Sequence, residues 1–253
     1  MEIAGKKAIV VGGASGMAKS SAEMLVKKGG SVAILDRPQS DGKAVAEELG
    51  GSFHPCDVTD HAGTEAAIDA AVDALGGELH VSINTAGGGI ARRTLTKDGP
   101  HPLEEFQGII ELNLIASFNV ARLAAAHMSR NEPEDDERGV IISTASIAAF
   151  EGQIGQVAYT AAKAGIAGMM LTMARDLGSL GIRTLAIAPS LFSTGLTQGI
   201  PDEFAAALTR DAAFPKRMGR PDEYGKLAIA IIENPMLNGA CIRLDAGQRF
   251  APK

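Results

Sequence analysis

Short apolar runs alternate with longer helical segments along the whole chain of 253 residues. Five of these runs are mostly apolar along their length, which is typical of strands covered by helices on both faces of a sheet. They lie at residues 8–11, 32–35, 81–83, 140–142 and 184–187. Weaker strand candidates lie at residues 53–56 and 240–244.

Segments with helical periodicity separate these strands. They lie at residues 17–28, 41–49, 61–75, 103–129, 156–179, 202–211 and 222–232. Strands and helices in this order predict one α/β domain over residues 1–253, with a Rossmann-like doubly wound fold. We expect a mostly parallel sheet of about seven strands, right-handed crossovers and helices on both faces. No repeat, low-complexity linker or change of composition marks a second domain.

Charge and residue usage exclude several classes of protein. The net charge of −6 does not favour binding to nucleic acids or anionic membranes, because both are polyanions. Cys56 and Cys241 stand far apart and are expected to be buried, reduced thiols. The five histidines lack the spacing of metal ligands, so no metal site is expected.

The hydropathy pattern predicts a cytoplasmic protein that does not enter a membrane. No uninterrupted apolar run approaches the ~20 residues that span a bilayer. The first predicted strand begins near residue 8, which leaves no room for a signal or transit peptide.

A glycine-rich turn, Gly12-Gly-Ala-Ser-Gly16-Met-Ala18, directly follows the first predicted strand. Glycines at a strand-to-helix turn let the backbone approach a pyrophosphate, while the helix N-terminus supplies N–H groups and partial positive charge. The spacing is GxxxGxA and not the dinucleotide fingerprint GxGxxG. A tight turn without a ligand also uses glycine, so the motif needs support from its surroundings.

Asp36 gives such support, because it ends the second predicted strand 20 residues after Gly16. A carboxylate there can accept hydrogen bonds from the adenosine ribose of a dinucleotide. It would repel the 2′-phosphate of NADP, so the sequence favours NAD. Arg37 follows immediately and could accommodate that phosphate instead. Alternatively, Asp36 is a simple turn residue before Pro38.

Small and polar residues also follow the third and fourth predicted strands. Asp57 and Val58 are placed to meet the adenine, and Asn84, Ala86 and Gly87 belong to a turn beside the cofactor. The carboxyl ends of strands form the ligand crevice of an open α/β sheet. We therefore expect residues 1–150 mainly to bind a dinucleotide.

The segment 190–220 mixes apolar side chains with proline and glycine. This composition favours a mobile substrate flap over a pocket, with an ordinary helical excursion as the alternative.

Tyr159 and Lys163 lie four positions apart in a helical segment, and therefore on the same face of the helix. A free phenol has a pKa of about 10, too high for a base near neutral pH. The nearby ammonium and an oxidised nicotinamide would favour the phenolate. Lys163 could also donate to the nicotinamide ribose. By itself, however, the pair could be a structural contact.

Ser146 precedes Tyr159 by 13 residues and follows the fifth predicted strand. Its hydroxyl could donate to a substrate oxygen and hold it beside the tyrosine. Ser143 and Thr144 compete for this role, and spacing favours Ser146. Asn113 is a polar residue in an otherwise apolar helix, where a helix kink and a catalytic role are equally compatible with the local sequence.

Together, these residues and motifs resemble the short-chain dehydrogenase/reductase superfamily along the whole chain. The resemblance implies that Tyr159 is the acid/base and that Lys163 tunes it and binds ribose. It also implies that Ser146 orients the substrate and that Asn113 supports a water-linked proton relay. The chain departs from the family pattern at Val11 for threonine, Ala18 for glycine and Pro189-Ser190 for Pro-Gly.

Three segments, residues 131–133, 146–156 and 232–239, are similar to the type II 3-hydroxyacyl-CoA dehydrogenases. This resemblance implies a homotetramer that uses NAD to oxidise a short or branched 3-hydroxyacyl-CoA to the 3-oxoacyl-CoA. It further implies that Ser15, Met17, Phe192 and Thr194 contact the cofactor and that Gln156 contacts the substrate.

Other functions stay open at this point. Enzyme alternatives are an NADPH-dependent 3-oxoacyl reductase and a hydroxysteroid dehydrogenase. The non-enzyme alternative is a dinucleotide-binding scaffold subunit, against which the intact serine, tyrosine and lysine set argues.

Overall fold

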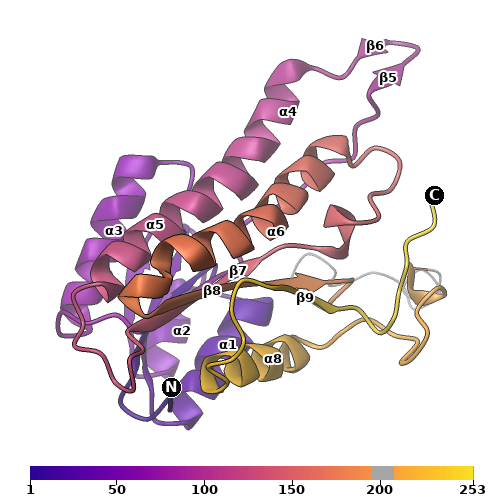
Figure 1. Cartoon of the computed structure of the whole chain (residues 1–253). Coiled ribbons are helices and arrows are strands. Elements are labelled where there is room, and N and C mark those ends of the chain that lie inside the picture. Colours follow the sequence, from indigo (N-terminus) through magenta and orange to yellow (C-terminus); the bar gives the residue numbers. More distant parts are fainter. Residues whose placement is uncertain (195–207, 253) are drawn as a thin grey trace.

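The computed structural model describes residues 1–194 and 208–252. Seven strands form one parallel sheet in the order β3-β2-β1-β4-β7-β8-β9 (Figure 1). The strands are β1 (Lys7–Val11), β2 (Ser31–Asp36), β3 (Ser52–Pro55), β4 (Val81–Asn84), β7 (Gly139–Thr144), β8 (Ile182–Pro189) and β9 (Cys241–Leu244). The predicted doubly wound sheet is confirmed, including its two weaker strands.

Helices cover both faces of this sheet, as Figure 1 shows. One apolar core lies between the sheet and α3, α5 and α6, and a second lies between the sheet and α1, α2 and α8. The helices are α1 (Gly16–Lys27), α2 (Gly42–Glu48), α3 (His61–Ala74), α4 (Leu103–Ile110), α5 (Ala116–Met128), α6 (Val157–Leu177) and α8 (Pro221–Glu233). Burial on both faces explains why the strands are mostly apolar along their length.

The strand order reverses direction at β1. From β1 the chain builds outward through β2 and β3, and it then returns to place β4 on the other side of β1. The crevice at the carboxyl ends of strands on either side of such a reversal is where open α/β sheets bind ligands. The topology therefore places the residues that follow β1 to β4 around one crevice.

The predicted helical segment over 103–129 is confirmed, but its middle is not α-helical. A π-helical turn, η1 (Glu111–Ile115), separates α4 from α5. The structure also contains a short hairpin of β5 (Leu95–Thr96) and β6 (Gly99–Pro100), which the sequence did not predict. Two-residue strands are too short for a periodic pattern. With α4, this hairpin projects beyond the sheet (Figure 1).

The predicted flap over 190–220 falls partly on residues 195–207, which lie outside the described residues, as does most of the predicted helix 202–211. The described flanks of this segment pair with each other. The Ser193 N–H donates to the Gly219 carbonyl and the Gly219 N–H donates to the Leu191 carbonyl, each at 2.8 Å. Residues 191–193 and Gly219 are thereby held together.

Two helical stretches are long and apolar enough to cross a bilayer by length and composition alone. They are Leu103–Met128 and Val157–Leu180. In the most apolar part of each, 56% of the residues are buried in the first stretch and 39% in the second. The sequence analysis considered only uninterrupted apolar runs, whereas these helices qualify by their mean hydropathy. Both stretches include core helices, which pass the same test, so the measure does not by itself indicate membrane insertion.

Arg183 joins the amino-terminal end of β8 to the last turn of α8. Its buried guanidinium donates to the carbonyl oxygens of Ile231 (2.8 Å), Ile232 (2.9 Å) and Leu237 (2.9 Å). It also forms an ion pair of 2.7 Å with Glu137. Carbonyl groups at a helix C-terminus carry partial negative charge, so the cation stabilises the end of α8.

Replacing Arg183 with methionine should lower the free energy of unfolding by about 3–5 kcal/mol, because Glu137 keeps only the Met1 ammonium as an ionic partner and the buried carbonyls at the end of α8 lose their donor. Urea denaturation of both proteins measures the difference. Arg210 is exposed, and among the described residues its ion pair is with its neighbour Asp211, so Arg210→Met should change the free energy by less than about 0.5 kcal/mol. Equal effects of the two substitutions would contradict the structural role of Arg183.

Candidate active site

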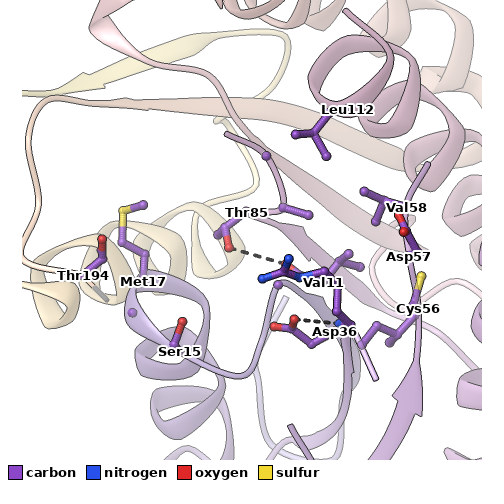
Figure 2. Close-up of a pocket in the computed structure, with 16 residues that line it drawn as sticks. Val11, Ser15, Met17, Asp36, Cys56, Asp57, Val58, Thr85, Leu112 and Thr194 are labelled. Carbon is purple, nitrogen blue, oxygen red and sulfur yellow. Dashed lines mark hydrogen bonds between the residues drawn. The ribbon is translucent and has the colours of Figure 1, made fainter. Parts of the chain in front are cut away.

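A cleft of about 490 Å³ opens at the carboxyl ends of β1 to β4 (Figure 2). Ten of the predicted cofactor-binding residues line it. They are Gly12, Ser15, Gly16, Met17, Asp36, Asp57, Val58, Ala86, Gly87 and Thr194. The topology thus brings together residues from four strand ends, and Thr194 joins them from the far part of the chain.

The turn after β1 is shaped for close approach of a ligand backbone. Gly12 has φ +78°, and a Cβ there would lie 2.8 Å from the Thr85 hydroxyl oxygen. Helix α1 begins just beyond, at Gly16, and has no acidic residue in its first turn. The side chain of Ser15, the N-cap, makes no capping hydrogen bond. The first N–H groups of α1 are therefore available to an anion such as a pyrophosphate.

Asp36 lies at the wall of the cleft with its carboxylate held in place. One oxygen accepts a hydrogen bond from the Ala14 N–H (3.0 Å) and the other from the Arg37 N–H (2.7 Å). The carboxylate retains further acceptor capacity toward the cleft. Asp36 is therefore more than a turn residue before Pro38. The exposed Arg37 side chain lines the same cleft.

Asp57 and Val58 line the region of the cleft that follows β3 (Figure 2). The Asp57 carboxylate accepts hydrogen bonds from the hydroxyl and the N–H of Thr59 (2.7 and 3.0 Å), which lower its pKa. Its negative charge is thus maintained. Leu35, Cys56, Thr85 and Leu112 also line the cleft and were not predicted. The first three adjoin predicted residues in sequence, whereas Leu112 comes from a distant helix.

Both cysteines are free. Cys56 is buried, as predicted, and burial raises the pKa of its thiol. Cys241 is only half-buried, because β9 is the edge strand of the sheet. Burial raises the pKa of the Cys241 thiol to about 11. A raised pKa keeps a thiol protonated and poorly nucleophilic near neutral pH.

Asn84 does not line the cleft and instead supports the turn beside it. Its side-chain oxygen accepts from the Ala86 N–H (3.0 Å), and its amide donates to the Ser117 hydroxyl (3.4 Å). The Asn84 carbonyl accepts from the Thr144 hydroxyl, which also bonds the Tyr224 hydroxyl, each at 2.7 Å. Asn84 therefore acts on the cleft through the turn that it fixes.

Ser146, Tyr159 and Lys163 meet beyond the end of β7. Ser146 caps the short helix η2 (Ile147–Ala149), and its side chain forms a hydrogen bond with Tyr159. Lys163 lies one helical turn beyond Tyr159, with Nζ 5.6 Å from the centre of the tyrosine ring. The competing Thr144 hydroxyl is buried and bonded within the core. Of the serine candidates, Ser146 is the one that meets the tyrosine.

Burial controls the protonation of this group. Burial raises the pKa of Tyr159, while the hydrogen bond with Ser146 acts in the opposite direction. Burial lowers the pKa of Lys163 to about 8, and its ammonium donates to the Thr144 carbonyl at 2.8 Å. In the protein alone, desolvation of the phenolate is the larger effect on Tyr159. The expected lowering of this pKa by Lys163 together with an oxidised nicotinamide stays a prediction.

Asn113 lies fully buried in the π-helical turn. Its amide donates to the carbonyls of Ile109 (3.0 Å) and Gly88 (2.8 Å), and its oxygen accepts from the Gly88 N–H (3.2 Å). The next residue, Gly89, lies against the Tyr159 ring, where a Cβ would come within 3.0 Å of it. Asn113 thus provides a donor for the Ile109 carbonyl at the π-helical turn. It also fixes the loop after β4, at Gly88, beside the Tyr159 ring. Its part in a proton relay stays a prediction.

Tyr159 and Lys163 do not line the cleft, and their predicted contact with the cofactor stays a prediction. Two further predicted residues, Phe192 and Gln156, also lie outside this cleft. Phe192 is buried in the core on the α8 side of the sheet and packs against Gly219. The Gln156 side-chain oxygen accepts from the Gln153 N–H at 3.0 Å, which shapes the loop before α6. Substrate contact by Gln156 and cofactor contact by Phe192 stay predictions.

The cleft fits a dinucleotide in its chemistry. A glycine turn with an uncapped helix N-terminus stands beside a fixed carboxylate, and the three residues beyond β7 carry an acid/base group. Among the described residues, no group of three or more histidine, cysteine or acidic side chains is arranged to hold a metal ion.

A family model for the short chain dehydrogenase matches residues 6–204. The chain belongs to the short-chain dehydrogenase family and is an oxidoreductase. This family uses a nicotinamide dinucleotide, for which the cleft has the matching residues.

Curated relatives at almost full length are 3-hydroxyacyl-CoA dehydrogenases of type 2. The chain is 48% identical to 3-hydroxyacyl-CoA dehydrogenase type-2 of Bos taurus and 47% identical to that of Homo sapiens. Each match covers 99% of this chain and 97% of the relative. A crystal structure of 3-hydroxyacyl-CoA dehydrogenase type-2 from Mycobacterium avium superposes with a TM-score of 0.94 at 42% identity, covering 98% of both chains. The resemblance inferred from sequence motifs is confirmed.

The pKa of Lys163 has a measurable consequence for stability. Between pH 8 and 10.5 the buried amine is neutral in the folded protein, whereas the unfolded chain still binds the proton. Stability rises with pH wherever the unfolded state binds more protons. Relative to Lys163→Met, the wild type should gain roughly 3 kcal/mol of unfolding free energy as pH rises through this window. Urea denaturation at several pH values tests this, and parallel curves for the two proteins would contradict it.

Proposed function

We propose that the chain oxidises a short or branched 3-hydroxyacyl-CoA to the 3-oxoacyl-CoA with NAD. The observation that carries this proposal is the contact of Ser146, which follows β7, with Tyr159 in α6. Lys163 lies one helical turn beyond Tyr159 in the same helix. Similarity to type-2 3-hydroxyacyl-CoA dehydrogenases over nearly the whole chain supports the choice of substrate.

Ser146 is poised to orient the alcohol. Its hydroxyl oxygen accepts a hydrogen bond from the Ala148 N–H at 3.1 Å, so the hydroxyl keeps its own proton for donation, in this structure toward Tyr159. Donation to the substrate oxygen holds that oxygen beside Tyr159. Tyr159 then takes the proton of the substrate hydroxyl on its phenolate oxygen as the carbonyl forms. A bound nicotinamide dinucleotide supplies the hydride acceptor and, when oxidised, a positive charge.

Tyr159 needs that additional charge. Burial raises the pKa of its phenol, and the Lys163 ammonium is held on the Thr144 carbonyl rather than on the phenol oxygen. A further positive charge in the cleft favours the phenolate over the phenol. We infer that the tyrosine becomes an effective base only when the oxidised dinucleotide is bound, so proton removal is coupled to cofactor occupancy.

Replacing Tyr159 with phenylalanine should reduce kcat by orders of magnitude, because the proton acceptor is lost, while the dissociation constant of NAD changes little. Turnover of 3-hydroxybutyryl-CoA and NAD titration by fluorescence measure the two effects. Tyr224 is the other tyrosine of the chain, and Tyr224→Phe is the matched control. It should retain turnover within about threefold and lose about 1 kcal/mol of stability with its hydrogen bond. Near-normal activity of Tyr159→Phe would remove this residue from the acid/base role.

We propose NAD as the preferred dinucleotide, because the fixed Asp36 carboxylate can accept the ribose hydroxyls and would repel a 2′-phosphate. Arg37 supports the competing function, an NADPH-dependent 3-oxoacyl reductase, since its exposed guanidinium lines the same cleft. The two neighbouring side chains favour opposite cofactors. Because the Asp36 carboxylate is anchored by Ala14 and the Arg37 side chain is exposed, we expect Asp36 to dominate.

Replacing Asp36 with asparagine should therefore raise the ratio of kcat/KM for NADP to that for NAD by about tenfold or more. Arg37→Leu should lower the same ratio and leave kcat/KM for NAD nearly unchanged. Steady-state kinetics with both cofactors measure the ratios. A wild-type protein that strongly prefers NADP would contradict the assignment of NAD and favour the reductase.

A further inference from the structure

The C-terminal segment returns to the loop that connects Ser146 with Tyr159 (Figure 1). The Ile154 N–H donates to the Pro252 carbonyl at 3.0 Å. The Gln153 side-chain amide donates to the Ala251 carbonyl at 3.3 Å. Two residues of the loop are thereby bonded to the last described residues of the chain.

Arg243, on the edge strand β9, is the centre of this contact. Its guanidinium donates to both Glu151 carboxylate oxygens (2.8 and 2.9 Å), and to Asp245 (2.7 Å) and the Gln248 carbonyl (3.0 Å). It also lies over the Phe150 ring, 5.2 Å from the centre. One side chain thus connects β9, the C-terminal segment and the loop before α6.

The ion pairs around Arg243 are partly shielded from water. The exposed fraction of the side chain is 22% for Arg243, 26% for Glu151 and 9% for Asp245. Arg249 adds a second cation, 3.0 Å from Asp245 and 3.4 Å from Glu151. Two arginines therefore alternate with two carboxylates. A planar guanidinium bound to both oxygens of a carboxylate fixes orientation as well as distance, which an ammonium cannot do.

Short steps connect Glu151 to the Ser146 hydroxyl. The Glu151 N–H donates to the Ile147 carbonyl at 3.0 Å, which closes the turn that follows Ser146. Within this turn the Ala148 N–H donates to the Ser146 hydroxyl oxygen. Displacing Glu151 would therefore loosen the turn that orients the serine hydroxyl.

The same loop rests on the first turn of α6, next to Tyr159. Gly152 lies against Thr160, where a Cβ would come within 2.1 Å of the threonine hydroxyl oxygen. The Thr160 N–H donates to the Gln156 carbonyl at 2.7 Å, and the Gln156 side chain holds the Gln153 N–H. The loop that Arg243 holds thus reaches both residues that would touch the substrate oxygen.

We propose that Arg243 is a positioning residue for the reaction, which clamps Glu151 and Phe150 to the C-terminal segment and so fixes Ser146 relative to Tyr159. The inference rests on the proposed function for the identity of the reaction. Arg243 does not line the dinucleotide cleft, so its loss should leave cofactor binding intact while the alignment of the alcohol with the base is impaired.

Arg243→Lys keeps the charge and removes the planar fork, and Glu151→Gln keeps the shape and removes the charge. Both should lower kcat for 3-hydroxybutyryl-CoA by about tenfold or more, since small displacements of reacting groups are costly. The dissociation constant of NAD should stay within about twofold of the wild-type value. Amide hydrogen exchange of residues 147–156 should accelerate in both variants. The double variant should be little worse than either single one, because both break the same contact.

Arg183→Lys is the matched control, because Arg183 is also a buried arginine paired with a glutamate but lies at the opposite end of the strands. It should lower stability without changing kcat or the exchange of 147–156. An unchanged kcat in folded Arg243→Lys and Glu151→Gln, or the same loss of kcat in Arg183→Lys, would overturn the proposal. If the wild type fails to oxidise 3-hydroxyacyl-CoA, the proposed function is wrong. Independently of activity, unchanged amide exchange of residues 147–156 in Arg243→Lys and Glu151→Gln would contradict the positioning role of Arg243.

Discussion

Thr144, the last residue of β7, connects the parts of the site through its two oxygens. Its hydroxyl bonds the Asn84 carbonyl at the end of β4 and the Tyr224 hydroxyl in α8, and its carbonyl accepts from the Lys163 ammonium in α6. Two strands and one helix from each face of the sheet therefore meet at one residue. The buried polar groups are satisfied by one another, which fixes their relative positions more firmly than apolar contacts alone would.

The electrostatics of the site follow from this burial. The Lys163 ammonium is the principal positive charge near Tyr159, yet it is desolvated and has one hydrogen-bond acceptor, the Thr144 carbonyl. Desolvation also opposes the phenolate. The protein thus provides position and exclusion of water, and in the proposed mechanism the bound dinucleotide supplies the further positive charge that favours the phenolate.

The residue pattern was sufficient to predict several side chains of the site. Asp36 could be placed because its distance from the glycine turn is set by one helix and one strand, and the spacing of Tyr159 and Lys163 is a single helical turn. A helix kink at Asn113 was one of two interpretations of the sequence, but the hydrogen bonds of this side chain to Gly88 could not be predicted, because Gly88 is remote in sequence. Asn84 was correctly placed in the turn after β4, but the sequence did not show that its side chain bonds Ala86 and Ser117 and does not line the cleft.

The sequence by itself determined the order of strands and helices, the glycine turn and the local spacing of the acid/base pair, since these depend on residues close together along the chain. Only the tertiary structure decided which oxygen holds Lys163, why the pKa of Tyr159 rises and how Arg243 reaches Glu151. Those properties depend on desolvation and on contacts between residues far apart in the chain. Neither leaves a periodic signal in a sequence, because burial is a property of the packed molecule.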